Sequence, residues 1–245
     1  MAKNVLTYNL WELLNDVTTA EVNINTAEGN LTIDRFTGSE QVLASGTLQY
    51  FENQGPPSRN LNSSNGQAAL TLRGGNTRQP WFHFPWAACN GAIEWQIHLN
   101  AAVSFDITAR SGGGNVRLDL TGMVVTRVSA DTGGGNMDVV LPDHAANLSV
   151  AAKAGAGNVT IDLGTGTTGS NTVNANSGAG NVVVRVPGGI AARVHATTGL
   201  GKVIVDPRFN RTDKNTYQSP DYDGAADKVE IIIHSGAGNV SVNAK

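Results

Sequence analysis

The sequence predicts an all-β fold, an elongated β-solenoid of the β-helix or β-roll type with about eight to ten coils of roughly 22 residues. Three observations lead to this prediction. Glycine supplies 29 of the 245 residues and charged side chains only 15%, a balance that favours strands and turns over helices. Glycine clusters recur at a nearly constant interval. After each cluster, apolar and polar residues alternate.

The glycine clusters define the repeat. Their final glycines are separated by 21, 22, 23 and 21 residues and then by 37, at Gly114, Gly135, Gly157, Gly180, Gly201 and Gly238. Gly91 lies 23 residues before the first of these, and weaker echoes occur at Gly66, Gly46 and Gly29. A fixed period over most of a chain indicates stacked structural units, and the interval of 37 indicates an insertion.

A short strand is predicted directly after each cluster. Its apolar residues occupy every second position, and this period of two is typical of a strand with one buried face. The same pattern follows Gly29, at Leu31 and Ile33. We expect the equivalent side chains of successive coils to lie above one another in a shared interior: Val116, Met137, Val159, Val182 and Val203.

A second, weaker strand is predicted in several coils, in segments that begin at Val124, Asn147, Thr172 and Ala192. Each coil then consists of a strand, a turn, a strand and a glycine-rich turn. One such coil cannot offset the entropy lost when it is ordered, whereas several stacked coils share one continuous core.

The corners between strands explain the glycines and the asparagines that follow them. Glycine permits a positive φ where the chain turns, and asparagine hydrogen-bonds the local backbone or tolerates the left-handed region. In a stack, the asparagines also align into a ladder of side-chain amides: Asn115, Asn136, Asn158, Asn181 and Asn239. Lys202 interrupts this ladder, which predicts that the ladder is not essential.

The whole chain, residues 1–245, is predicted to form one domain. Residues 1–90 form irregular N-terminal coils with an aromatic insertion, and residues 91–245 form regular glycine-asparagine repeats with an insertion at about 207–228. The aromatic residues of the two insertions either cap the ends of the stack or form a ligand or partner surface. The candidate surface consists of Trp81, Phe82, Phe84, Trp86, Phe209, Tyr217 and Tyr222.

No catalytic, metal-binding or cofactor-binding residues are predicted. Gly164, Gly166 and Gly169 match the dinucleotide fingerprint, but the following segment cannot form the required helix, so this is a corner. A calcium-binding β-roll is a sharper alternative, because four aspartates share one position of the repeat: Asp34, Asp119, Asp162 and Asp206. Val140 and Arg185 occupy that position in other coils, which favours a solvated face. The five histidines form no helical metal pair.

Charge and hydropathy exclude several classes of partner and location. A net charge of −3 without a basic tract disfavours nucleic acid and anionic membranes. Cys89 is the only cysteine, so neither an intrachain disulfide nor a thiolate zinc site is possible. No apolar run is long enough to span a bilayer, and no signal peptide is evident. These features predict a soluble chain, cytoplasmic if Met1 is native.

The segment EWQIHLNAAVSFDITARSGGGNVRLDLTGMVVTRVSADTGGGNMDVVLPD resembles the toastrack module of bacterial and archaeal envelope proteins. The ending SPDYDGAADKVEIIIHSGAGNVSV resembles the closing unit of that family, with Tyr222 before the final strand. The likeness covers Gly91 to Lys245 well and the first ninety residues loosely. It implies relatives labelled "putative adhesins" and the C-terminal domain of LiaF-like proteins of the cell-envelope stress response. Many such relatives carry transmembrane helices, and the family supplies no catalytic residues.

The resemblance therefore implies a non-enzymatic interaction or scaffold module of the cell envelope, in the context of envelope-stress sensing. The expected partner is a membrane-associated envelope protein or a glycan, and the stack ends allow a homo-oligomer. One alternative is a carbohydrate-binding, adhesin-like domain that uses the aromatic residues from Trp81 to Trp86. A weaker alternative is a polysaccharide-active enzyme on a β-helix.

Overall fold

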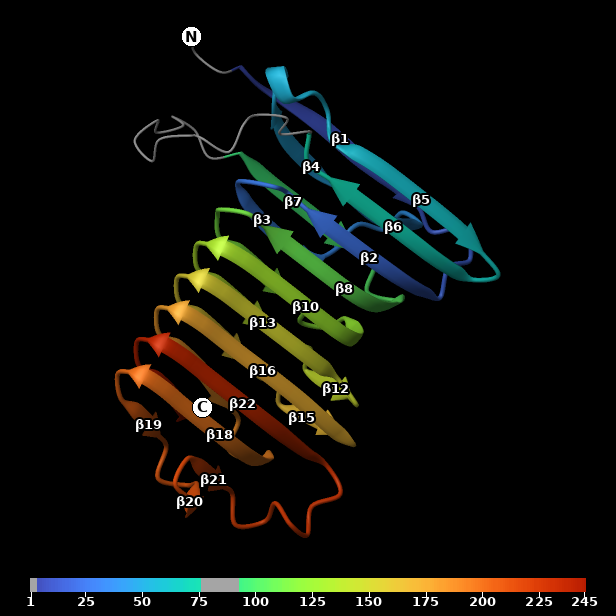
Figure 1. Ribbon diagram of the computed structural model, residues 1–245. Coiled ribbons are helices and arrows are strands. Elements are labelled where there is room, and N and C mark those ends of the chain that lie inside the picture. The colour runs from blue at the N-terminus through green and yellow to red at the C-terminus, as the bar shows by residue number, and fades with distance from the viewer. Residues whose placement is uncertain (1–3, 76–92) are drawn as a thin grey trace.

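The computed structural model describes residues 4–75 and 93–245, and their fold is built from two long sheets (Figure 1). Sheet A contains, in spatial order, β1 (Val5–Leu13), β4 (Val42–Phe51), β7 (Glu94–Leu99), β3 (Asn30–Arg35), β9 (Val116–Asp119), β11 (Met137–Val140), β14 (Val159–Asp162), β17 (Val182–Val186), β23 (Val240–Ala244) and β19 (Val203–Val205).

Sheet B lies against sheet A and runs along the same axis. It contains, in spatial order, β20 (Asn210–Asp213), β21 (Thr216–Gln218), β18 (Ala191–Leu200), β22 (Lys228–Ala237), β16 (Ser170–Ala179), β13 (Ser149–Ala156), β10 (Val124–Gly134), β8 (Ser104–Ser111), β2 (Thr19–Asn25), β6 (Gln67–Arg73) and β5 (Ser58–Ser64). A small third sheet pairs β12 (His144–Ala146) with β15 (Gly166–Thr168), and one short 3-10 helix, η1, spans Glu52–Gln54.

The predicted solenoid is confirmed. Eight pairs of consecutive strands, each with one strand in sheet B and the next in sheet A, form coils in the described residues: β2–β3, β6–β7, β8–β9, β10–β11, β13–β14, β16–β17, β18–β19 and β22–β23. Neighbouring coils pair in parallel and in register, so that Met137 lies between Val116 and Val159. The inward residues form one continuous hydrophobic core from Leu10 to Val242. Each fully buried aliphatic side chain contributes about 1.5–3 kcal/mol.

The order of the coils differs from the order of the sequence at both ends of the stack. Val240 of β23 lies between Val182 and Val203, so the prediction that Val203 stacks directly on Val182 is wrong. At the other end, Leu31 of β3 lies between Trp95 of β7 and Val116 of β9. The 37-residue interval explains why β22 lies between β16 and β18. β21 pairs with the outer side of β18 and β20 pairs with β21, so the chain returns on the inner side of β18.

Within each coil, the sheet B strand is longer than the sheet A strand that follows it, which corrects its description as a second, weaker strand. β10 has 11 residues and β16 has 10, whereas the strands that follow them have 4 and 5. Their inward positions are filled largely by small side chains, including Ala130, Ala152 and Ala175. Alanine gives a faint hydrophobic alternation, so the sequence pattern understates these strands.

The corner glycines form a column in which each coil touches the next through its backbone. The φ of Gly135 is +156°, and a Cβ atom placed on it would lie 2.2 Å from the Gly114 carbonyl oxygen. Gly157 repeats this relation to Gly135, at 2.0 Å. Conformation and lack of space therefore both require glycine at the corners.

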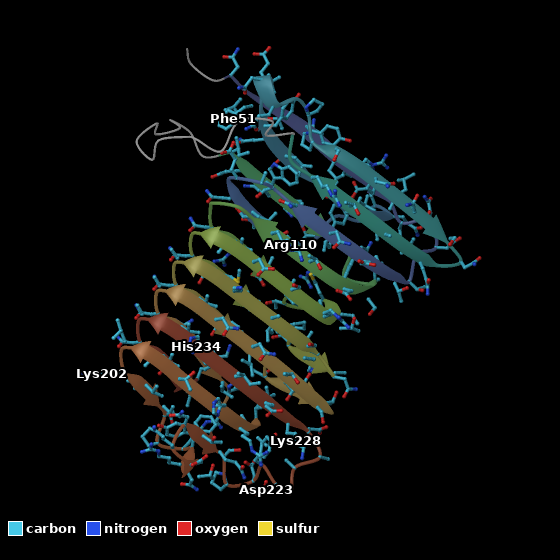
Figure 2. The ribbon with its side chains drawn as sticks, viewed as in Figure 1. Phe51, Arg110, Lys202, Asp223, Lys228 and His234 are labelled. Atoms are coloured by element: carbon cyan, nitrogen blue, oxygen red, sulfur yellow. The ribbon has the colours of Figure 1, made fainter. Side chains whose placement is uncertain are left out.

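The asparagines form a ladder that runs mainly from side chain to backbone. The Asn115 Oδ1 accepts a hydrogen bond from the backbone N–H of Asn136 at 2.9 Å, and Asn136 does the same for Asn158 at 3.0 Å. Lys202 was predicted to interrupt the ladder, but in the structure it lies at the end of the ladder. Its backbone N–H donates to Asn239 Oδ1 at 3.0 Å, and no further coil of the described chain follows β19 in sheet A. Figure 2 shows Lys202 at the opposite end of the stack from Phe51.

A column of hydroxyl groups, which the sequence reading missed, supports the same corners. The Thr132 Oγ1 donates to the carbonyl of Gly114, and the Ser177 Oγ to that of Gly157, both at 2.8 Å. Ser111, Ser235 and Thr198 make equivalent hydrogen bonds to the corner carbonyls of the neighbouring coils. The sequence signal is a serine or threonine three residues before the final glycine.

Candidate functional site

The predicted aromatic surface falls into two parts. Trp81, Phe82, Phe84 and Trp86 lie outside the described residues, in the stretch of sequence between β6 and β7. In the other coils, the corresponding stretch is the glycine corner. Their role as a ligand or partner surface stays a prediction.

The three aromatic residues near the C-terminus lie in a cap over β18. Phe209 and Tyr222 are only 5% and 7% exposed, and Tyr217 is half-buried. The Arg208 guanidinium lies 4.3 Å from the Phe209 ring centroid, and the Arg193 guanidinium lies 4.4 Å from that of Tyr222. Burial raises the pKa of the Tyr222 hydroxyl above its ordinary value. These contacts hold the Phe209 and Tyr222 rings against their own fold. The role of the three residues as a ligand or partner surface stays a prediction.

The cap is tied to sheet B by charged side chains. Arg193 Nη2 donates to Asp223 Oδ1 at 3.2 Å, and Lys228 Nζ lies 5.2 Å from the centroid of the Tyr222 ring. Figure 2 shows Asp223 and Lys228 at this end of the stack. The insertion therefore covers the open edge of β18, which would otherwise present unpaired backbone groups.

The aspartates of the shared repeat position are engaged locally. Asp162 accepts a hydrogen bond from Arg185 Nη1 at 2.9 Å, and Asp34 pairs with His98. Asp206 Oδ1 accepts the backbone N–H of Arg208 at 3.0 Å. Among residues 4–75 and 93–245, no group of three or more histidine, cysteine, aspartate or glutamate side chains could hold a metal ion. The Gly164–Gly169 segment connects β14 with β16 through β15, as a corner between coils.

A hydrophilic groove of about 890 Å³ lies on the outer face of sheet B near the N-terminal end of the stack. We call it the sheet B groove. Residues 19–21 of β2, 61–64 of β5, 67–69 of β6, Ser104 and Asp106 of β8, and Thr126 of β10 line it. These five strands are consecutive neighbours in the sheet (Figure 1).

Two local features shape the sheet B groove. The β5–β6 hairpin turns at Asn65 and Gly66, which both have positive φ, and the Gly66 carbonyl accepts the backbone N–H of Thr18 at 2.8 Å. This bond fixes the hairpin tip beside β2. On the other side, Thr126 is an extra residue in β10 where the register with β8 shifts, and such a bulge bends a strand.

The charge of the sheet B groove is concentrated in one pair of carboxylates. Glu21 and Asp106 are register partners on the adjacent strands β2 and β8. Burial raises the pKa of Asp106, and the charge of Glu21 raises it further, whereas Arg127 lowers it. Arg127 Nε lies 3.3 Å from Asp106 Oδ2, and Asn23 Nδ2 donates to Glu21 Oε1 at 2.8 Å.

An apolar edge lies at the same end of the molecule. β1 is the terminal strand of sheet A and pairs with β4 on one side. Its Trp11 and Leu13 side chains are 55% and 56% exposed. The ring of Trp11 meets that of Phe36 edge-on, with centroids 6.3 Å apart. We call Trp11, Leu13 and Phe36 the β1 edge patch. The sequence reading missed it because a single tryptophan in a strand resembles an ordinary core residue.

Hydropathy adds one finding about membranes. Within residues 4–75 and 93–245, no helix has the length and apolar character needed to cross a bilayer.

Known families match the chain from end to end. The family described as "N-terminal domain of toast_rack" matches residues 3–162, and the family described as "Cell wall-active antibiotics response LiaF, C-terminal" matches residues 146–242. No curated protein matches the chain.

Solved structures also resemble the fold. The crystal structure of a "putative cell adhesion protein" from Clostridium sporogenes is similar, with a TM-score of 0.66 and 20% identity, over 99% of this chain and 100% of that chain. That of a "putative adhesin" from Bacteroides fragilis has a TM-score of 0.35 and 11% identity, over 98% of this chain and 97% of that chain.

Proposed function

The chain belongs to the toast_rack family, and from this premise we propose that it is a non-enzymatic interaction module of the cell envelope that acts in envelope-stress sensing. The observation that carries the proposal is that the two matched families, one of them named for the cell-wall antibiotic response, together cover residues 3–242. A stack held by continuous columns of backbone and side-chain hydrogen bonds is suited to a rigid scaffold.

The proposed partner is a membrane-associated envelope protein that contributes an extended apolar segment to the side of β1 that pairs with no other strand of the described residues. Strand addition needs an exposed sheet edge for main-chain hydrogen bonds and side-chain contacts beside it for specificity. β1 supplies nine residues of edge, and the β1 edge patch supplies apolar contacts beside it.

Site-specific photo-crosslinking in cells tests this proposal. A photoreactive phenylalanine analogue replaces Trp11 in one variant and the exposed Ala151 of sheet B in the control. We expect the Trp11 variant, but not the Ala151 variant, to crosslink to one membrane protein, identified by mass spectrometry. Equal crosslinking at both positions, or none at Trp11, would overturn the proposed partner site. Turnover of any member of a polysaccharide panel would overturn the non-enzymatic proposal.

Carbohydrate binding is a second candidate function, and the sheet B groove favours it. Its lining of hydroxyl, amide and carboxylate groups is able to hydrogen-bond a ligand rich in hydroxyls. The similar structure from Clostridium sporogenes carries the name of a "putative cell adhesion protein".

A further inference from the structure

We propose that the sheet B groove binds an amine-bearing oligosaccharide that lies across β6, β2 and β8. This inference deepens the carbohydrate-binding candidate and is independent of the protein partner proposed for the β1 edge patch. The two surfaces lie on different sheets, so their experiments fail separately.

The lining of the sheet B groove selects a hydrophilic ligand. Sites for drug-like molecules are mostly apolar and aromatic, with a few polar groups. Here hydroxyls from Thr19, Ser64 and Ser104 and amides from Asn62 and Gln67 face the groove, while no aromatic ring lines it among the described residues. Leu61 is its only large apolar side chain there. Such a surface offers many donors and acceptors and exposes more polar than apolar area, which suits a polyhydroxylated ligand.

The dimensions of the sheet B groove select an oligomer over a single sugar. The groove crosses five neighbouring strands. At about 4.8 Å between strands, this corresponds to a length of about 19 Å across the sheet. Its volume of about 890 Å³ lies near the upper end of the range of small-molecule sites, roughly 300–1,000 Å³. A ligand that runs across the strands contacts side chains from several coils at once.

The carboxylate pair selects a positively charged group on that ligand. Glu21 and Asp106 stand directly opposite each other, and like charges in this position repel. No lysine or arginine is among the described residues that line the groove, and Arg127 reaches Asp106 from beside it. A primary ammonium between the two carboxylates relieves the repulsion and makes charge-assisted hydrogen bonds. The same pair repels uronic acids.

Titration calorimetry with defined tetrasaccharides tests the inference. The probes are a glucosamine tetramer, its N-acetylated counterpart and a galacturonic acid tetramer, with tetralysine as a cationic probe without hydroxyls. The variants are the double substitution Glu21→Gln with Asp106→Asn, and Ala69→Trp, which fills the groove from β6. The matched control is Glu230→Gln, because Glu230 projects from β22 between Thr172 and Arg193, outside the groove. Circular dichroism verifies that each variant is folded.

We expect saturable binding of the glucosamine tetramer by the unaltered chain and by Glu230→Gln, with at least a tenfold weaker affinity in both groove variants. The N-acetylated tetramer should bind at least tenfold more weakly than the glucosamine tetramer, and the galacturonic acid tetramer should not bind. Absence of glucosamine binding would overturn the inference. So would equal binding of tetralysine, equal binding of the N-acetylated tetramer, or full affinity in the groove variants.

Discussion

At the scale of single residues, the stack depends on glycine at the corners, because a Cβ atom there would overlap the neighbouring coil. At each corner, the carbonyl oxygen of one coil occupies the space that a Cβ atom on the corner glycine of the next coil would need. This close approach recurs at the corner glycines from Gly29 to Gly201. The first glycine of a cluster is under the same constraint, since a Cβ atom on Gly133 would lie 2.2 Å from the Gly112 carbonyl oxygen, but the middle glycine is not. Gly134 precedes Gly135 directly, yet a Cβ atom on Gly134 would meet nothing within 4 Å. Adjacent glycines of one cluster therefore have different roles.

Gly135→Ala should lower the free energy of unfolding by about 3 kcal/mol or more, because the new Cβ meets the Gly114 carbonyl and φ is positive. Gly134→Ala is the matched control, and its effect should stay within about 0.5 kcal/mol. Urea denaturation followed by circular dichroism measures both. Similar losses in the two variants would show that the column has no special packing.

The hydroxyl column has a gap at Ala154. Ala154 lies in register between Thr132 and Ser177, so the Gly135 carbonyl receives no equivalent hydroxyl. Ala154→Ser should raise the free energy of unfolding by about 1 kcal/mol, and Ser177→Ala should lower it by a similar amount. Thermal and urea unfolding measure both changes. A loss of stability in Ala154→Ser would mean that the hydroxyl does not reach the carbonyl.

Asp106 makes the stability depend on pH. Burial raises its pKa in the folded chain, so the folded state binds this proton more tightly than the unfolded state. The contribution of Asp106 is therefore fully present below the unfolded pKa and is lost as pH rises through the folded pKa. Asp106→Asn should raise the melting temperature at pH 7 relative to the unaltered chain, with a smaller difference at pH 3. Calorimetry that finds the larger gain at pH 3 would contradict this sign.

At the scale of strands and coils, the sequence predicts the repeat well and its edges poorly. The strands of sheet A were predicted because buried apolar residues recur at every second position, with polar residues between them, as in Val159, Ile161 and Leu163. The longer strands of sheet B were described too weakly because their inward positions often hold alanine. Lys202 was interpreted as an interruption because one more repeat follows its coil in the sequence, although its strand β19 is last in the spatial order of sheet A.

At the N-terminal end of the stack, an ion pair links the two sheets. Glu12 of β1 is 3% exposed, and Arg59 of β5 donates to both of its carboxylate oxygens. This partner raises the pKa of the Arg59 guanidinium above its ordinary value. The pair joins the terminal strand of sheet A to that of sheet B.

Arg59→Ala should lower the free energy of unfolding by about 2 kcal/mol, because Glu12 remains buried without its partner. Adding Glu12→Met to the same chain should restore most of the loss, since the uncompensated charge is gone. Denaturant unfolding of the single and double variants measures the difference. If the double variant is as unstable as Arg59→Ala, the loss comes from packing of the arginine side chain.

At the scale of the whole molecule, the exchange of coils explains what the sequence could not predict. Every coil has the same period and the same corner, so nothing in a single coil specifies its neighbours. The one clue was the interval of 37 residues, which places β20 and β21 between Gly201 and Gly238. The result is that the first and last coils are each paired on both sides rather than left at an end.

The same reasoning applies to the candidate sites. Phe209 and Tyr222 were predicted as candidate surface residues because aromatic residues are scarce in the sequence. In the structure, both side chains are buried in the cap. The sheet B groove gave no local signal, because five strands each contribute a few ordinary polar residues. Only the register of β2 with β8 brings Glu21 to Asp106. Surface sites of a solenoid arise from stacking order and are invisible within one repeat.

The central claim is that the coils share one interior, with the last coil inserted before the end of the stack. Disulfide trapping tests it directly, in a chain that carries Cys89→Ser. Thr172 of β16 is the register partner of Glu230 of β22, and Arg193 of β18 lies one strand further.

Neighbouring strands are about 4.8 Å apart, within the Cα separation that a disulfide bridges, whereas two strand spacings exceed it. Under mild oxidation, cysteines at positions 172 and 230 should crosslink rapidly, and cysteines at 172 and 193 should not. Crosslinking between 172 and 193 without crosslinking between 172 and 230 would show that the coils stack in sequence order.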